Sequence, residues 1–239
     1  MNLDFEIVEW ESPTDLDWQS PEEQVTYAHL RITVGGVCIT EVYDAETKEN
    51  RSTILVCLMP LVSWLLENWE ALLIEENWPG TNRNDSLCPP NTEAAIEWRI
   101  NHCMAAVGQG FLWPDVTIYA EGDGVRIIHV PGKAEYGHIT YLNEVSVVVP
   151  QDEVRRAIVR LVRQVADRVE SLGHGTGVRD AAVEAGLFRV ITDAKLTSVS
   201  ISPDGQLDAQ WSVAAPTAHA DLLDGGAHEG DQRDPAIGE

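Results

Sequence analysis

The chain has 239 residues, of which 44% are hydrophobic and 23% are charged, a composition typical of a globular protein that can bury a core. It carries 16 basic and 39 acidic side chains, a net charge of −23. Phosphate backbones and anionic lipids are bound by clustered Lys and Arg, so this balance argues against direct binding of nucleic acid or of a membrane. The expected partner is a protein, and a basic protein is one candidate.

The N-terminal part of the chain predicts a small antiparallel sheet. Residues 3–10 alternate apolar and acidic side chains, which is typical of a strand with one face in water. Later runs are separated by Gly35-Gly36, a pair that favours a tight hairpin because type I′ and II′ turns need positive φ angles. We expect a three-stranded meander, which strand 3–10 can extend. The three β-rich runs cover residues 25–34, 37–43 and 51–58.

Two Trp-rich helices come next. The first covers residues 60–75 and begins at a Pro, which is well tolerated in a first turn. A loop at 77–90 separates it from a second helix over residues 92–107, capped by Asn91 or Thr92. Five large apolar side chains form one stripe along the first helix: Leu61, Leu65, Trp69, Leu72 and Leu73.

The second half of the chain predicts another hairpin and one long amphipathic helix. Gly122-Asp123-Gly124 separates two β-rich runs, and the continuous Val-rich run at 141–149 is typical of a strand covered on both faces. The helix at 150–172 carries an apolar stripe of Val, Ile and Leu. The remaining predicted elements are strands at 116–120 and 125–130, a short helix at 177–185, and short strands at 188–191 and 198–201.

These elements predict an α+β fold, with antiparallel β-meander and hairpins packed against the two Trp-rich helices and the long amphipathic helix. We expect a single domain over residues 1–213, and a division near 77–91 into 1–76 and 92–213 is the alternative. From Ala214 onward the chain is rich in Gly, Asp and Ala and has almost nothing to bury. Residues 214–239 are therefore predicted to be a disordered acidic tail.

No targeting or membrane signal is visible in the sequence. The first residues carry no basic stretch followed by a long apolar run, and the most apolar segment, 54–66, is too short to span a bilayer. The four Cys match no zinc-binding spacing. We therefore expect a cytoplasmic protein with reduced thiols.

Motifs for a metal, a cofactor or a nucleophile are also missing. The string nearest to HExxH, at 228–232, has no second His. His102 and Cys103 are neighbours on a predicted helix, so they point about 100° apart and cannot form a nucleophile–base pair with each other. His129 and His138 flank a turn and could approach each other, but they lack a third ligand. We expect no catalytic residue, no metal and no cofactor.

Two groups of polar residues remain as candidate sites. One lies in the Trp-rich helices, where an ion pair from Glu67 or Glu70 to Arg99 is either a structural bridge or part of a polar cleft. The other is a basic stripe on the long helix, which either docks on the acidic N-terminal half of the chain or contacts a protein or phosphate. The first group is Glu67, Asn68, Trp69, Glu70, Arg99 and His102, and the stripe is Arg155, Arg156, Arg160 and Arg163.

The strings PLVSWLLENWEALL from residue 60 and WRINHCMAAVGQGFLWPDVTI from residue 98 are distinctive. They resemble the N-terminal region that precedes the metallopeptidase domain in some bacterial proteins of the ImmA/IrrE type, over residues 55–172 of this chain. The peptidase motif itself is absent, so the resemblance implies an accessory module from a stress-response or mobile-element setting. It also implies a shared core or cleft that includes Trp113, Pro114 and Asp115 besides the helix residues above.

Three hypotheses for function follow. The first is a non-enzymatic bacterial interaction or regulatory protein, because catalytic motifs are missing and the chain is strongly acidic. The second is a hydrolase whose site lies between helices 60–75 and 92–107. The third is an acidic inhibitor that mimics the charge of a nucleic acid.

Overall fold

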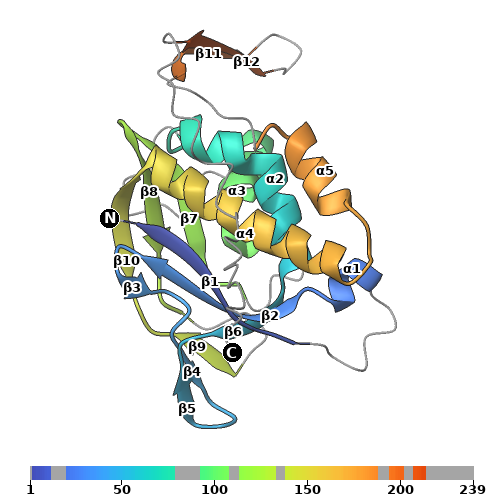
Figure 1. Ribbon diagram of the computed structural model, residues 1–239. Coiled ribbons are helices and arrows are strands. Elements are labelled where there is room, and N and C mark those ends of the chain that lie inside the picture. Colours follow the sequence, from blue (N-terminus) through green and yellow to red (C-terminus); the bar gives the residue numbers. More distant parts are fainter. Residues whose placement is uncertain are drawn as a thin grey trace, which may run out of the picture. The chain divides into compact units, whose positions relative to one another are not determined.

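Alternating apolar and polar residues build a four-stranded antiparallel sheet in the computed structural model (Figure 1). In it, β1 pairs with β2, and β3 and β6 both pair with the other edge of β2. Gly35 and Gly36 have φ angles of 59° and 89°, which confirms the predicted tight turn between β2 and β3. The strands are β1 (Leu3–Trp10), β2 (Tyr27–Val34), β3 (Val37–Cys38) and β6 (Ile54–Cys57).

The structure describes residues 2–11, 20–78, 92–107, 113–132, 138–187, 194–201 and 207–213. The chain forms two compact units, Met1–Phe188 and Arg189–Glu239. The domain limits drawn from the sequence, 1–213 with the alternative division near 77–91, stay a prediction. The predicted strand at 188–191 and the predicted tail at 214–239 lie outside the described residues.

β1 contains a β-bulge that changes which side chains face the core. Its register runs regularly from Leu3 opposite Val34 to Ile7 opposite Leu30, and then shifts between Ile7 and Glu9. Because Val8 is the extra residue, Trp10 comes to lie opposite Ala28. Ile7 and Trp10 therefore share one face of the sheet, although they are three positions apart and would lie on opposite faces of a regular strand.

The predicted meander is wrong in one respect, because the expected strand at 37–43 breaks in two. The break lies at Thr40, whose buried hydroxyl accepts a hydrogen bond from the Ile32 amide and donates one to the Ser52 carbonyl. The chain then leaves the first sheet and forms a second, in the order β5-β4-β9. Its strands are β4 (Val42–Asp44), β5 (Glu49–Arg51) and β9 (Ile139–Tyr141).

A third sheet has the order β10-β8-β7, with β7 (Val116–Glu121), β8 (Gly124–His129) and β10 (Val145–Pro150). The predicted strand at 141–149 is split between β9 and β10. Asn143 lies at the split and donates hydrogen bonds from its amide to the Cys38 carbonyl and the Glu41 carboxylate. The prediction that this run is covered on both faces is wrong, because Ser146 of β10 is exposed.

The helices follow the predicted apolar stripes closely. α2 (Leu58–Ile74) starts two residues before the Pro, directly after β6, and α4 (Gln151–Ser171) buries its whole stripe of Val, Ile and Leu. α3 (Glu93–His102) is shorter than predicted and continues as a 3₁₀ turn, η1 (Met104–Ala106). α1 (Pro21–Gln24) and α5 (Gly177–Glu184) are short. No helix in the described ranges is both long and apolar enough to cross a membrane.

Trp side chains join these helices through their indole N–H groups. Trp64 of α2 donates to the Ile100 carbonyl of α3 at 2.9 Å, and Trp69 donates to the Ala185 carbonyl after α5 at 3.1 Å. Trp98 donates to the Glu76 carbonyl at 3.1 Å. All three rings are buried, so each one satisfies its polar atom while filling the core.

The second unit contains one antiparallel hairpin of β11 (Ala194–Ile201) and β12 (Leu207–Val213). The predicted strand at 198–201 is the end of β11, and β12 was not predicted from the sequence.

Candidate functional site

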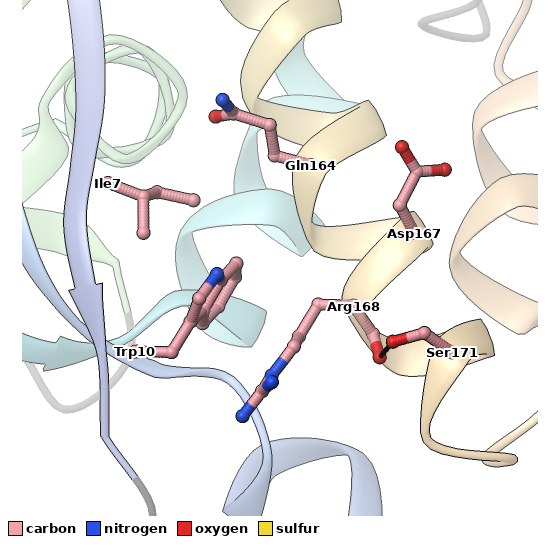
Figure 2. A pocket seen from close by; sticks show the side chains of 6 residues that line it. All are labelled: Ile7, Trp10, Gln164, Asp167, Arg168 and Ser171. Atoms are coloured by element: carbon pink, nitrogen blue, oxygen red, sulfur yellow. Dashed lines mark hydrogen bonds between the residues drawn. The ribbon is translucent and has the colours of Figure 1, made fainter.

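A groove lies between β1 and α4 (Figure 2). Its volume is about 430 Å³, and it is open to solvent. Side chains from the strand form one wall and side chains from the helix the other. We call it the β1–α4 groove; it is lined by Ile7, Trp10, Gln164, Asp167, Arg168 and Ser171.

The helix wall is one face of α4. Its four residues are spaced i, i+3, i+4 and i+7, so they lie on one side of the helix, next to the buried stripe. Gln164, Asp167 and Ser171 are exposed, and Ser171 donates a hydrogen bond to the Arg168 carbonyl at 2.8 Å. The Asp167 carboxylate is paired with Arg179 of α5 at 2.6 Å, so the group that this wall offers to whatever enters the groove is mainly the Gln164 amide.

Trp10 forms the apolar part of the groove together with Ile7. The Arg168 guanidinium lies 5.3 Å from the centroid of the Trp10 ring, within the range of a cation–π contact. Arg168 also donates to the Val25 carbonyl at 3.3 Å. Both side chains are half-buried, so the ring is held in place and still reaches the groove (Figure 2).

β1 and Glu11, the residue that follows it, carry a row of carboxylates in this region. Three of them have basic neighbours: Asp4 lies 2.6 Å from Arg160, Glu6 lies 2.8 Å from Arg31, and Glu11 lies 3.3 Å from His29. Glu9 is exposed and takes part in no ion pair with another described residue. The strand beside the groove is therefore acidic.

This groove was not predicted from the sequence, for an identifiable reason. The α4 residues read as an ordinary solvent face, and strict alternation along 3–10 places Trp10 on the wet face. The usable signal was the Trp itself, because a large aromatic side chain at the end of a strand is rarely left in water.

The predicted polar cleft between the Trp-rich helices is not assembled as expected. Glu67, Glu70 and Arg99 are all exposed, and no ion pair joins either carboxylate to Arg99. Asn68 is buried and donates to the Trp64 carbonyl of its own helix at 2.9 Å. The charged residues of this group thus point away from the helix contact.

His102 lies in a buried environment. It is fully buried and stacks on Trp98 with ring centroids 4.3 Å apart. Its Nδ1 lies 2.8 Å from the Trp98 carbonyl, so Nδ1 carries the proton and donates it. Its Nε2 has no hydrogen-bond partner and lies 3.6 Å from the Glu75 carboxylate. Burial lowers the pKa of His102, and burial together with the charge of Glu97 raises the pKa of Glu75.

Asp115 lies beside two other titratable groups. The Cys103 thiol donates to its carboxylate at 3.2 Å, and His129 bonds through Nδ1 to its backbone carbonyl at 2.9 Å. Burial and the Asp115 charge raise the pKa of Cys103 to about 11, so the thiol is not a nucleophile at neutral pH. Burial lowers the pKa of His129. Trp113 is buried close by in sequence.

The basic stripe of α4 divides among several neighbours. Arg155 lies over the Trp69 ring at 5.7 Å and donates to the Leu187 carbonyl, while Arg160 pairs with Asp4 of β1. Arg156 pairs with Asp152 and Glu153 of its own helix. Arg163 is half-buried. Of these four residues, Arg160 contacts a carboxylate of the N-terminal half, as predicted, whereas Arg155 contacts Trp69 and Leu187 and Arg156 contacts its own helix.

His129 and His138 contact different groups. His129 lies edge-on to Tyr141, whereas His138 lies 3.6 Å from Asp44 and 3.4 Å from Glu46. Asp44 is buried between the backbone amides of Glu46 and Thr47 and the Arg51 guanidinium. Burial alone would raise the pKa of Asp44, but these amides and the charges of Arg51 and His138 hold it below its usual value.

Within the described ranges, no group of three or more His, Cys, Asp or Glu side chains is placed to hold a metal ion. No protein-family model, no curated protein sequence and no solved structure matches the chain. The resemblance to the accessory region of ImmA/IrrE-type proteins stays a prediction.

Proposed function

We propose that this chain is a non-enzymatic interaction protein and that its β1–α4 groove binds a basic segment of a partner protein. A regulatory role beside a bacterial metallopeptidase system is the wider setting that the sequence resemblance implies. The observation that carries the proposal is the bulge at Val8, which brings Ile7 and Trp10 together on the groove side of β1.

The composition of the groove suits protein recognition. Trp and Arg are enriched among the residues that carry most of the binding free energy at interfaces, and both are present here in contact with each other. Ile7 adds apolar area, and the exposed Gln164 of α4 supplies a hydrogen-bonding amide beside it. A side chain that covers Trp10 would remove apolar surface from water while its backbone stays near the polar wall.

The charge of the chain favours a basic partner. Its net charge of −23 attracts cationic segments and raises the rate at which they meet the surface. On β1 itself, the exposed Glu9 is available to a Lys or Arg.

The hydrolase hypothesis has less support. Its four groups, Glu67, Glu70, Arg99 and His102, do not meet, because three are exposed and the fourth is buried against Trp98. The Cys103 thiol is buried and protonated.

The second candidate function is an acidic inhibitor that mimics nucleic acid, which the net charge of −23 favours. Such an inhibitor would need the acidic surface and not the groove. High salt weakens binding in both cases, so salt alone does not separate the two candidates.

A blocking substitution in the groove separates them. Basic peptides would be selected from a displayed library of short random peptides, and their affinities measured by calorimetry. Gln164→Trp places a large side chain in the groove from an exposed helical position, and Ser63→Trp does the same on the exposed face of α2 as a control. We expect Gln164→Trp to weaken binding by about tenfold or more and Ser63→Trp to leave it unchanged. Equal affinity for all three proteins would exclude the groove as the binding site.

A further inference from the structure

The outer edge of β1 has backbone groups directed away from its neighbour. The Gly35 amide donates to the Asn2 carbonyl, and the Glu11 amide donates to the Tyr27 carbonyl. Along an antiparallel strand, the backbone groups of successive residues point alternately to the neighbouring strand and away from it. These two bonds therefore show which residues of β1 bond to β2. The N–H and C=O groups of Leu3, Phe5 and Ile7 point to the outer side. Among the described strands, β1 pairs with β2 alone.

One ion pair crosses this outer edge. Asp4 alternates with the buried Leu3 and Phe5, so its side chain lies on the face of the sheet away from α4. Arg160 of α4 nevertheless reaches it, at 2.6 Å. Because β2 occupies the other edge of β1, the Arg160 side chain has to pass around the outer edge. It therefore covers the beginning of the strand, and among the described residues no strand pairs with the part around Ile7 and Trp10, beside the groove.

We propose that the partner segment binds as an added β-strand on the outer edge of β1, with alternate side chains entering the β1–α4 groove. This inference rests on the proposed function and specifies its mode of recognition. Strand addition gives affinity through backbone hydrogen bonds, and specificity through the pocket that receives every second side chain. Trp10 and Ile7 select an apolar residue at these positions, and Gln164 meets its backbone or its polar neighbour.

The occupant is a basic segment of another protein and not a second copy of this chain. β1 carries Asp4, Glu6 and Glu9, so pairing it with its own copy would place like charges across the new ladder, which is destabilising. A segment that alternates Lys or Arg with Val, Ile or Leu fits both faces. Its cations lie on the acidic face of β1, near Glu9, and its apolar side chains lie on the Trp10 face.

Backbone methylation tests the strand directly. Two versions of the tightest-binding basic peptide from the displayed library would carry N-methyl groups on alternate amides. One version is methylated at the odd-numbered residues and the other at the even-numbered residues. In an added strand only one parity donates to β1, so we expect one version to lose about tenfold or more in affinity and the other to bind nearly as well as the parent.

Arg160 provides a second readout. Arg160→Ala uncovers the edge, whereas Arg156→Ala removes the same charge from a part of α4 that pairs within the helix. We expect Arg160→Ala to strengthen binding about threefold more than Arg156→Ala does. Equal effects of the two substitutions would contradict the covering role of Arg160.

The outcomes separate this inference from the proposed function. If both methylated peptides bind like the parent while Gln164→Trp still abolishes binding, the groove binds side chains without strand addition, and the inference is wrong while the proposed function stands. If Gln164→Trp has no effect, the proposed function itself fails. Loss of affinity in one parity only, together with sensitivity to Gln164→Trp, supports both.

Discussion

The Arg168 guanidinium lies 5.3 Å from the centroid of the Trp10 ring, and this contact joins the long helix to the end of the first strand. It depends on the extra residue at Val8, which turns Trp10 toward the helix. The same arrangement leaves an open groove beside the two side chains. A local irregularity of one strand thus creates the surface on which the proposed function rests.

Deletion of Val8 tests the role of the bulge. Without it, Leu3, Phe5, Ile7 and Trp10 alternate strictly and still face α4. We therefore expect the free energy of unfolding to change by less than about 1 kcal/mol in chemical denaturation.

Deletion of Arg31 is the matched control, because β2 has no spare residue at that point and is paired on both edges. A shift of one residue there moves buried side chains to the wet face and should cost more than about 3 kcal/mol. A Val8 deletion as harmful as the Arg31 deletion would show that the bulge itself is required for folding.

Part of this fold could be predicted from the sequence. α4 was predictable because its apolar residues recur at helical spacing over the whole element, and the turns at Gly35-Gly36 and Gly122 were predictable because few residues other than Gly adopt positive φ easily. The split strands were not predictable, because the Thr40 and Asn143 side chains end them through bonds to residues distant in sequence.

The candidate site was less accessible to prediction. The positions of Glu67 and Glu70 could have been foreseen, since the stripe that buries Leu65, Trp69 and Leu72 turns both carboxylates to solvent. The position of Cys103 could not have been foreseen, because α3 ends at His102 and the chain then turns toward β7. Trp10 was misplaced by a bulge that leaves no clear mark in the sequence.

Substitutions in the Trp-rich helices should separate structural from surface residues. Trp69→Ala removes a buried ring and its bond to Ala185, and it should lower the free energy of unfolding by about 3–5 kcal/mol. Glu67→Ala and Arg99→Ala change exposed side chains and should stay within about 0.5 kcal/mol. A large loss for either of the charged residues would indicate a contact between the helices that the structure does not contain.

The contribution of His102 and His129 to stability should fall as the pH drops below about 6.5, the ordinary pKa of a histidine. Burial lowers the pKa of His102 and of His129 in the folded state, so the unfolded chain binds protons that the folded chain does not. This loss of stability is absent at pH values above the pKa of the unfolded histidine. It grows as the pH falls toward the pKa of the folded histidine. Each histidine adds at most about 1.4 kcal/mol per pH unit.

Denaturation of wild type and of His102→Phe at about pH 7.5 and about pH 5.5 measures this effect. The variant should lose less stability than wild type between the two pH values, whatever its stability at the higher one. An unchanged pH dependence in both His102→Phe and His129→Phe would contradict the assignment.

Thiol labelling should follow burial. Cys57 and Cys103 are buried, and burial raises the pKa of both thiols, whereas Cys38 is half-exposed. Iodoacetamide added to the native protein should therefore modify Cys38 well before Cys57 and Cys103, as read by mass spectrometry of peptides. Labelling in denaturant is the control, in which all three should react. Rapid native labelling of Cys103 would show that it is accessible, and would revive a catalytic role.

The most direct test of the central claim is a map of where a basic peptide binds, obtained from amide chemical shifts of the isotope-labelled protein during a titration. We expect the largest shifts at Ile7 and Trp10 of β1 and at Gln164 and Arg168 of α4. Shifts spread evenly over the acidic surface, or centred on α2 and α3 with β1 unchanged, would contradict the account.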